Sequence, residues 1–323
     1  IKGAIRMYSK YINNLRKKDN SFVSMDEILE NIVDNVENVN VEIDPVTNLP
    51  LKYEIQKGYK ENQKIKIKDT DFEYNFIKYA YDTVIPSQEN NPISAERLRT
   101  TSGTIVVYTD GSRTQYLIDK GRGSKALRIL RIINNAEKNK IIESQYFDFS
   151  EDFFIWLIAK FMNDDRVIDE DESINISRII GFKGEGIQKQ AILSGSGNEV
   201  LNLLSSLSFL IEMDVMTEIE IRINHGNETF EFRFYSKNSQ IDILLDNYTG
   251  QYMMDLQDDR DPKVLLNSFI DILPSIMNSY SEDLESGDWN QDSKRNFILG
   301  LVDSVKNKLE IIYPSDSNKS LSI

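Results

Sequence analysis

The spacing of hydrophobic residues predicts a chain that changes between helices and strands. Apolar side chains recur every three or four residues over 4–15, and again after Ser24, where Ser24 and Glu27 form a capping box. Residues 104–118 contain two short apolar runs around Asp110-Gly111, which predicts a hairpin. The aromatic segment 71–84 is ambiguous, and we predict a helix there.

The second half of the chain alternates more regularly. Ser150 begins a strongly apolar helix that ends near Met162. Strands at 174–182 and 187–193 and a helix from Asn198 follow. A meander of three strands with apolar residues at every second position then covers 219–245, and two helices close the chain. We place these helices at Pro262–Asp283 and Ser293–Leu309. The pattern predicts an α+β fold with mixed or antiparallel sheets and packed helices.

The charged residues of the meander select one of two strand registers. With Ile223 opposite Phe230, Arg222 faces Glu231 and Glu220 faces Arg233; the tighter register would place Glu220 opposite Glu231. Each cross-strand charge pair contributes about 0.2–1 kcal/mol, so we predict the register with two opposite-charge pairs. The loop 224–229 is then expected to project His225 beyond the sheet.

An acidic run divides the chain in two. The segment 164–172 carries six carboxylates, which repel one another and favour an exposed loop. We therefore predict an N-terminal α/β unit at 1–164 and a C-terminal α+β unit at 165–323.

Composition excludes several kinds of chemistry. The 323 residues include no cysteine and one histidine, which leaves no thiolate nucleophile, disulfide or Cys/His zinc site. His225 is also the only imidazole available to a catalytic triad, and it lies at a predicted turn. We predict no cofactor and no metal, and the sequence leaves open whether the protein is an enzyme.

Charge and hydropathy favour a cytoplasmic protein. The formal net charge is −14, which disfavours general adhesion to nucleic acid or to anionic membranes. No apolar stretch approaches the length of about 20 residues that a membrane span requires, and no signal peptide is apparent. The frequent Asn, Ile and Lys residues suggest an AT-rich genome, either bacterial or phage.

The most suggestive motif is a glycine turn between a predicted strand and a predicted helix. Residues 119–140 hold seven basic and two acidic side chains inside this acidic chain. We call residues 120–128 the basic turn, and we expect its helix N-terminus to bind an anion. The alternative is a tight turn followed by a solvated basic helix face. The candidate ligand-binding residues are Lys120, Arg122, Gly123, Ser124, Lys125 and Arg128.

A second constellation suggests catalysis. Asp110, Asp119 and Lys120 lie on adjacent predicted strands, and two carboxylates with a lysine are what a metal-dependent nuclease or phosphoesterase uses. Because Asp119 and Lys120 are consecutive, their side chains should point to opposite faces. Asp110 is also the natural first residue of an Asp-Gly turn.

These observations favour a non-enzymatic intracellular binding or sensor subunit of a bacterial multi-protein assembly. Phage defence is one setting that the coding bias allows. We expect a protein partner or a homo-oligomer, because the apolar segments 153–161 and 201–211 would suit a subunit interface. The basic turn would suit a phosphate-bearing ligand or nucleic acid. The alternative is the nuclease or phosphoesterase of Asp110, Asp119 and Lys120.

Overall fold

The computed structural model describes residues 6–34, 42–134, 141–186, 192–196, 207–208, 210–211 and 213–313. It divides into two units, and the fold is α+β. Unit 1 comprises Ile1–Tyr146, Gln240–Asp242 and Tyr252–Asp271; unit 2 comprises Phe147–Ser239, Ile243–Gln251 and Ile272–Ile323. The predicted division at residue 164 does not coincide with these units, because the helix after Ser150 belongs to unit 2.

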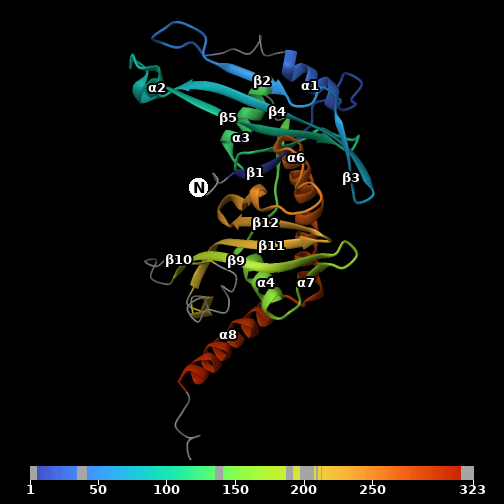
Figure 1. Cartoon of the computed structure of the whole chain (residues 1–323), viewed down its shortest axis with the longest axis vertical. Coiled ribbons are helices and arrows are strands. Elements are labelled where there is room, and N and C mark those ends of the chain that lie inside the picture. The colour runs from blue at the N-terminus through green and yellow to red at the C-terminus, as the bar shows by residue number, and fades with distance from the viewer. Residues whose placement is uncertain are drawn as a thin grey trace, which may run out of the picture. The chain divides into compact units, whose positions relative to one another are not determined.

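Unit 1 is built on one antiparallel sheet (Figure 1). The strands follow the order β1–β6–β5–β4–β2; β3 also pairs with β4, and β7 and β13 also pair with β1. The strands are β1 (Met7–Asn13), β2 (Tyr53–Lys57), β3 (Gln63–Ile67), β4 (Thr70–Val84), β5 (Leu98–Thr109), β6 (Gln115–Ile118), β7 (Ile142–Gln145) and β13 (Gln240–Ile243).

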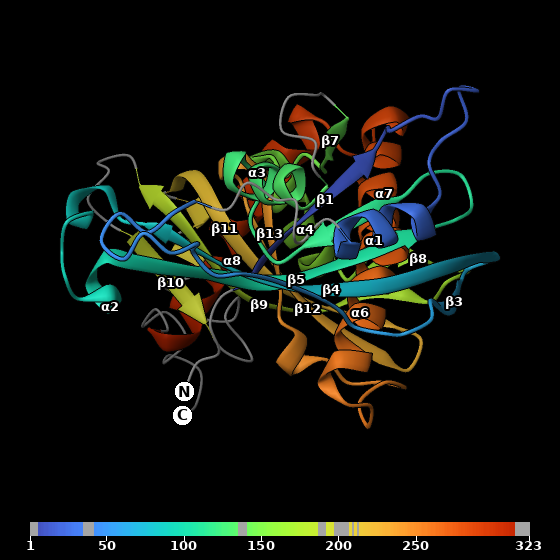
Figure 2. The ribbon, with the colours of Figure 1, turned by 90° about the horizontal axis from the view of Figure 1, so that it is seen from above.

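Helices cover both faces of this sheet. On one face, α1 (Met25–Asp34) and α3 (Ser124–Ile133) bury their apolar stripes against β4, β5 and β6 (Figure 2). On the other face, α6 (Gln257–Asn267) places Leu265 near Phe76 and Val106. The capping box of α1 is confirmed, since the Glu27 N–H donates to Ser24 Oγ over 3.4 Å and the Ser24 N–H donates to Glu27 Oε2 over 3.1 Å. Short helical segments are found at Pro86–Gln88 and at α2 (Ser94–Arg97).

Two segments that we predicted as helices are strands. The segment 71–84 forms β4, and 4–15 contains β1. In both strands consecutive residues are buried, for example Tyr11 and Ile12 in β1. A strand that is buried on both faces loses its alternation, and its apolar residues then also satisfy a helical spacing.

Unit 2 has a second antiparallel sheet in the order β10–β9–β11–β12, with β8 also paired to β9. The predicted register is confirmed: Ile223 pairs with Phe230, Arg222 with Glu231 and Glu220 with Arg233. The strands are β8 (Val167–Asp169), β9 (Ile174–Gly186), β10 (Ile192–Ser196), β11 (Met213–His225) and β12 (Glu228–Tyr235).

The core of unit 2 is aromatic. Ser150 caps α4 (Glu151–Met162) by accepting a hydrogen bond from the Phe153 N–H over 3.1 Å. Phe153 packs against Phe234 of the sheet, with ring centroids 5.8 Å apart, and against Tyr280 at 5.4 Å. The apolar segment 153–161 is therefore core and not a spare interface; most of 201–211 lies outside the described residues.

Unit 2 also contains α7 (Leu273–Ser286) and α8 (Gln291–Ile312). A π-helical turn, Ser268–Ile272, precedes α7, and single 3-10 turns lie at Lys237–Ser239 and Leu245–Asn247. The acidic run 164–172 is mostly exposed, as predicted, although it includes β8. Both flanks of the run belong to unit 2, so it is not a boundary between the units.

Candidate functional site

The basic turn connects β6 to α3 in unit 1. The helix begins at Ser124, which confirms the predicted start, and Gly123 is its N-cap residue. Gly123 has a φ of +154°, a backbone conformation that side chains disfavour, and no side chain caps the helix. At the N-cap position of α3, therefore, the glycine leaves the backbone uncovered by a side chain of its own.

Side chains of strand β1 hold the backbone of the turn in place. Ser9 Oγ donates to the carbonyl oxygen of Lys120 over 2.7 Å, and the hydroxyl of Tyr11 lies 3.5 Å from both the N–H and the carbonyl oxygen of Gly123. Both side chains belong to the buried part of β1. The turn is therefore fixed by the core of the unit, which gives its exposed basic residues a defined position.

The structure separates the predicted ligand-binding residues into two groups. Lys120 is directed inward: its Nζ lies 3.1 Å from Asp119 Oδ1 and donates to the carbonyl oxygen of Ser102 over 3.2 Å. Arg122 stacks on the ring of Tyr146, with its guanidinium carbon 3.4 Å from the ring centroid. Gly123, Ser124 and Lys125 are exposed.

Two cations of the turn remain available. Among the described residues, neither Arg122 nor Lys125 has an ion-pair partner. Arg128, one turn further along α3, is 3.9 Å from Glu42 Oε1, and both side chains are exposed. Of the predicted residues, Arg122, Gly123, Ser124 and Lys125 therefore lie together at the turn, Arg128 lies at its margin, and Lys120 is directed inward.

The proposed nuclease site is wrong, because the strands place its acids at opposite ends of a hairpin. The Asp119 N–H donates to the carbonyl oxygen of Thr104, whereas Asp110 follows the far end of β5, six residues beyond Thr104. At about 3.3 Å per residue this separation is roughly 20 Å. Two carboxylates on one cation must approach within about 5 Å.

Asp110 and Asp119 instead have structural partners. The Asp110 carboxylate accepts hydrogen bonds from the N–H and the hydroxyl of Ser112, and so closes the turn. Asp119 accepts a hydrogen bond from the Tyr79 hydroxyl over 3.2 Å, and burial raises the pKa of its carboxyl group. The expectation that Lys120 points away from Asp119 is also wrong, because the strand ends at Ile118 and the chain bends there.

A cavity in unit 1 was not predicted from the sequence. It has a volume of about 230 Å³ and lies between the sheet and α6. Lys78 of the sheet and Asp258 of α6 are joined across it by an ion pair of 2.6 Å. Burial raises the pKa of Asp261, which also lines it. No sequence signal could indicate this cavity, since Asp119 and Asp261 are 142 positions apart.

Unit 2 contains a larger groove, of about 600 Å³, between α4 and α8. Its polar groups already bond to one another: the Trp156 indole donates to Asp283 over 2.7 Å, and Lys160 lies 3.3 Å from the same oxygen. Beside it, Asp152 accepts a hydrogen bond of 2.8 Å from the Trp289 indole and pairs with Lys294 at 3.0 Å. The bonds to Asp283 fasten α7 to α4, and the bonds of Asp152 fasten the start of α8 to α4.

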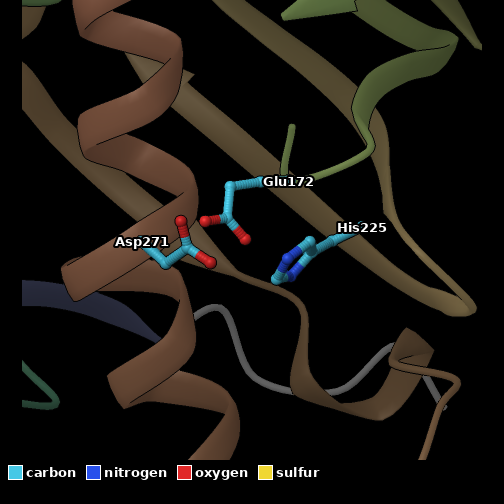
Figure 3. A group of neighbouring side chains, drawn as sticks. All are labelled: Glu172, His225 and Asp271. Carbon is cyan, nitrogen blue, oxygen red and sulfur yellow. The ribbon is translucent and has the colours of Figure 1, made fainter. Parts of the chain in front are cut away.

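His225 is the last paired residue of β11, opposite Glu228, and Gly226-Asn227 forms a two-residue turn. The predicted loop 224–229 is therefore wrong, because Gly226 adopts a φ of +54° and permits a tight hairpin. Figure 3 shows His225 beside Glu172, also of unit 2, with ligand atoms within 4.8 Å. The third residue drawn, Asp271, ends unit 1, and there it pairs with Lys68 at 3.0 Å.

The chain matches no known protein family, and no curated protein matches it significantly. Within the described ranges, no helix is both long enough and apolar enough to span a membrane.

Proposed function

We propose that this protein is a non-enzymatic binding subunit whose basic turn recognises an anionic group, either on a phosphate-bearing ligand or on a partner protein. The observation that carries the proposal is the position of the half-buried Arg122 and the exposed Lys125 beside the uncapped start of α3. Neither cation has an ion-pair partner among the described residues.

Three effects favour an anion at this point. The N-terminus of a helix carries a partial positive charge and presents N–H donors. Gly123 leaves the backbone accessible, since it has no side chain. Arg122 and Lys125 add two full charges, and stacking on Tyr146 restrains the guanidinium group before a ligand binds.

The charge of the whole chain favours a compact anion over a long polyanion. At a net charge of −14, the protein repels polyanions at long range, while a single phosphate or carboxylate is attracted locally by the turn. We therefore favour a ligand with one anionic group over nucleic acid. From coding bias and composition, we place the protein in a cytoplasmic assembly of a bacterium, and phage defence is one candidate process for that assembly.

The test uses inorganic phosphate as the probe and the backbone amide signals of the full chain in nuclear magnetic resonance spectra. We expect the amide signals of Gly123, Ser124 and Lys125 to shift with phosphate concentration. Arg122→Glu with Lys125→Glu should weaken binding at least about tenfold, because one hydrogen bond to a charged group contributes about 1.5–3 kcal/mol. The melting temperature should change little, because Lys125 is exposed, Arg122 is only half-buried, and neither has an ion-pair partner among the described residues.

Lys18→Glu with Lys60→Glu provides the charge-matched control, since both are exposed lysines of the same unit outside the turn. This variant should bind phosphate as the unaltered chain does. If the amide signals of the turn do not move, or if the double variant and the control lose binding equally, the basic turn is not an anion site.

A further inference from the structure

Helix α8 exposes a regular stripe. Its six positions are separated by four, three, four, three and four residues, which is the spacing of a coiled-coil seam. All six side chains are exposed, and the apolar members range from 40% for Leu309 to 75% for Tyr313. The stripe, as we use the term below, consists of Arg295, Leu299, Val302, Lys306 and Leu309 of α8 and of Tyr313, the C-cap residue that follows the helix.

The stripe is distinct from the face by which α8 packs within unit 2. Leu301 is the buried residue of α8, and Lys294 pairs with Asp152. Asn290 caps the helix by accepting hydrogen bonds from the N–H groups of Asp292 and Ser293. The helix is thus anchored by one face and its N-terminus, while the stripe is left to solvent.

The charges on and beside the stripe indicate which partner it can bind. Among the described residues, neither Arg295 nor Lys306 has an ion-pair partner, and both stand in line with the apolar positions. Asp303 and Glu310 lie along one flank of the stripe and are exposed. A surface that carries cations in its seam and carboxylates beside it is complementary to a copy of itself in one orientation only.

That orientation is antiparallel. A parallel pair would set Lys306 against Lys306 and Arg295 against Arg295, which is repulsive. An antiparallel pair centred on residue 304 sets Leu299 against Leu309 of the second copy and Arg295 against its Tyr313. Lys306 then faces Val302 of the second copy, next to its Asp303, which can neutralise the ammonium group.

We propose that this face of α8 is a self-association surface, on which two copies pair antiparallel about a twofold axis near residue 304. Such an interface uses the same patch on both subunits, so each favourable contact occurs twice. The stripe covers 18 residue steps, or about 27 Å of helix. A contact of this size is at the small end of specific interfaces, so the dimer should dissociate on dilution.

The absence of cysteine from the chain permits a direct test of orientation. Leu299→Cys and Leu309→Cys are made separately in the full chain and oxidised alone or as a mixture. In the antiparallel pair, residues 299 and 309 of different copies meet, whereas identical positions are offset by about 15 Å. A disulfide requires Cα atoms within about 7 Å. The mixture should therefore form a covalent dimer, and each variant alone should not.

Sedimentation equilibrium over about 1–200 µM measures the association itself. Leu309→Glu should weaken dimerisation at least about tenfold, because it places a carboxylate in the apolar seam. Leu284→Glu is the matched control: Leu284 lies on α7 with 45% exposure, close to the 40% of Leu309. The control should dimerise as the unaltered chain does.

A chain that stays monomeric over this range would overturn the proposal, as would covalent dimers of either single-cysteine variant alone, which would indicate a parallel pair. Equal loss of association in Leu309→Glu and Leu284→Glu would also contradict it. The surface is independent of the proposed function, so the Arg122→Glu, Lys125→Glu variant is expected to dimerise normally.

Discussion

The ion pair between β11 and β12 offers a quantitative test of the unit 2 sheet. Glu231 is only 3% exposed, and Arg222 Nε donates to its Oε1 over 2.8 Å. Asn247 donates to the other carboxylate oxygen. We predict that Arg222→Met destabilises unit 2 more than Glu231→Met does, because only the first substitution leaves a buried charge without its counter-ion.

The magnitude follows from the burial of each partner. Removing one partner of a buried pair costs about 3–5 kcal/mol. Because the Arg222 side chain is 35% exposed and Asn247 still donates, we reduce this to about 2–4 kcal/mol for Arg222→Met. Glu231→Met leaves an arginine that can turn to water, so we expect about 0–1.5 kcal/mol. The double variant should resemble Glu231→Met alone, so the coupling energy should equal the cost of Arg222→Met, about 2–4 kcal/mol.

Urea unfolding followed by tryptophan fluorescence measures these differences selectively. Both tryptophans, Trp156 and Trp289, belong to unit 2, so the signal reports on that unit. Lys237→Met, an exposed lysine of the same unit, controls for the loss of a positive charge. Equal and additive effects of Arg222→Met and Glu231→Met would refute the reasoning, because they would show that neither side chain depends on the other for its burial.

Two further predictions concern single residues. Gly300→Ala should stabilise unit 2 by about 0.5–1 kcal/mol in the same urea assay, because a Cβ at this position of α8 would meet no atom within 4 Å; a loss of stability would show that α8 packs more closely there. Burial raises the pKa of Asp119, so the native state holds this proton more tightly than the unfolded chain and the free energy of unfolding falls as the pH rises above about 4. Asp119→Asn removes this dependence, so its melting temperature should gain on that of the unaltered chain between about pH 4 and pH 7; a constant difference would contradict the prediction.

Local signals in the sequence predicted local structure well. Ser150 and Ser24 marked helix starts because capping needs only neighbouring residues, and the glycine before Ser124 did the same for α3. The register of β11 and β12 was also predictable, since Arg222, Glu231 and their neighbours form charge pairs that only one alignment satisfies. In each case the deciding interaction joins residues that are close in the sequence.

Features that depend on distant segments could not be predicted. Strand β4 resembled a helix because α6, almost two hundred positions later, covers the face that would otherwise have been polar. The inward direction of Lys120 depends on Ser102 and on the bend after Ile118, neither of which a motif records. The candidate binding site is therefore smaller than its sequence motif, and the nuclease hypothesis failed on a distance that only the pairing of β5 and β6 defines.

Unit 1 is assembled from three separate segments of the chain, and this affects how it folds during synthesis. Strand β1 pairs with β13, where Tyr8 lies opposite Ile241. One face of the sheet is covered by α6. A ribosome must therefore release more than 260 residues before the unit has all its parts; β6 and β7 can pair with β1 earlier, but the pairing of Met7 and Tyr8 with β13 comes only after β13 is made. Fragments that end at residue 146 or 164 would lack both β13 and α6, so expression trials of the N-terminal half alone should yield aggregates, whereas a circularly permuted chain that brings 240–271 next to β1 is the rational way to isolate the unit.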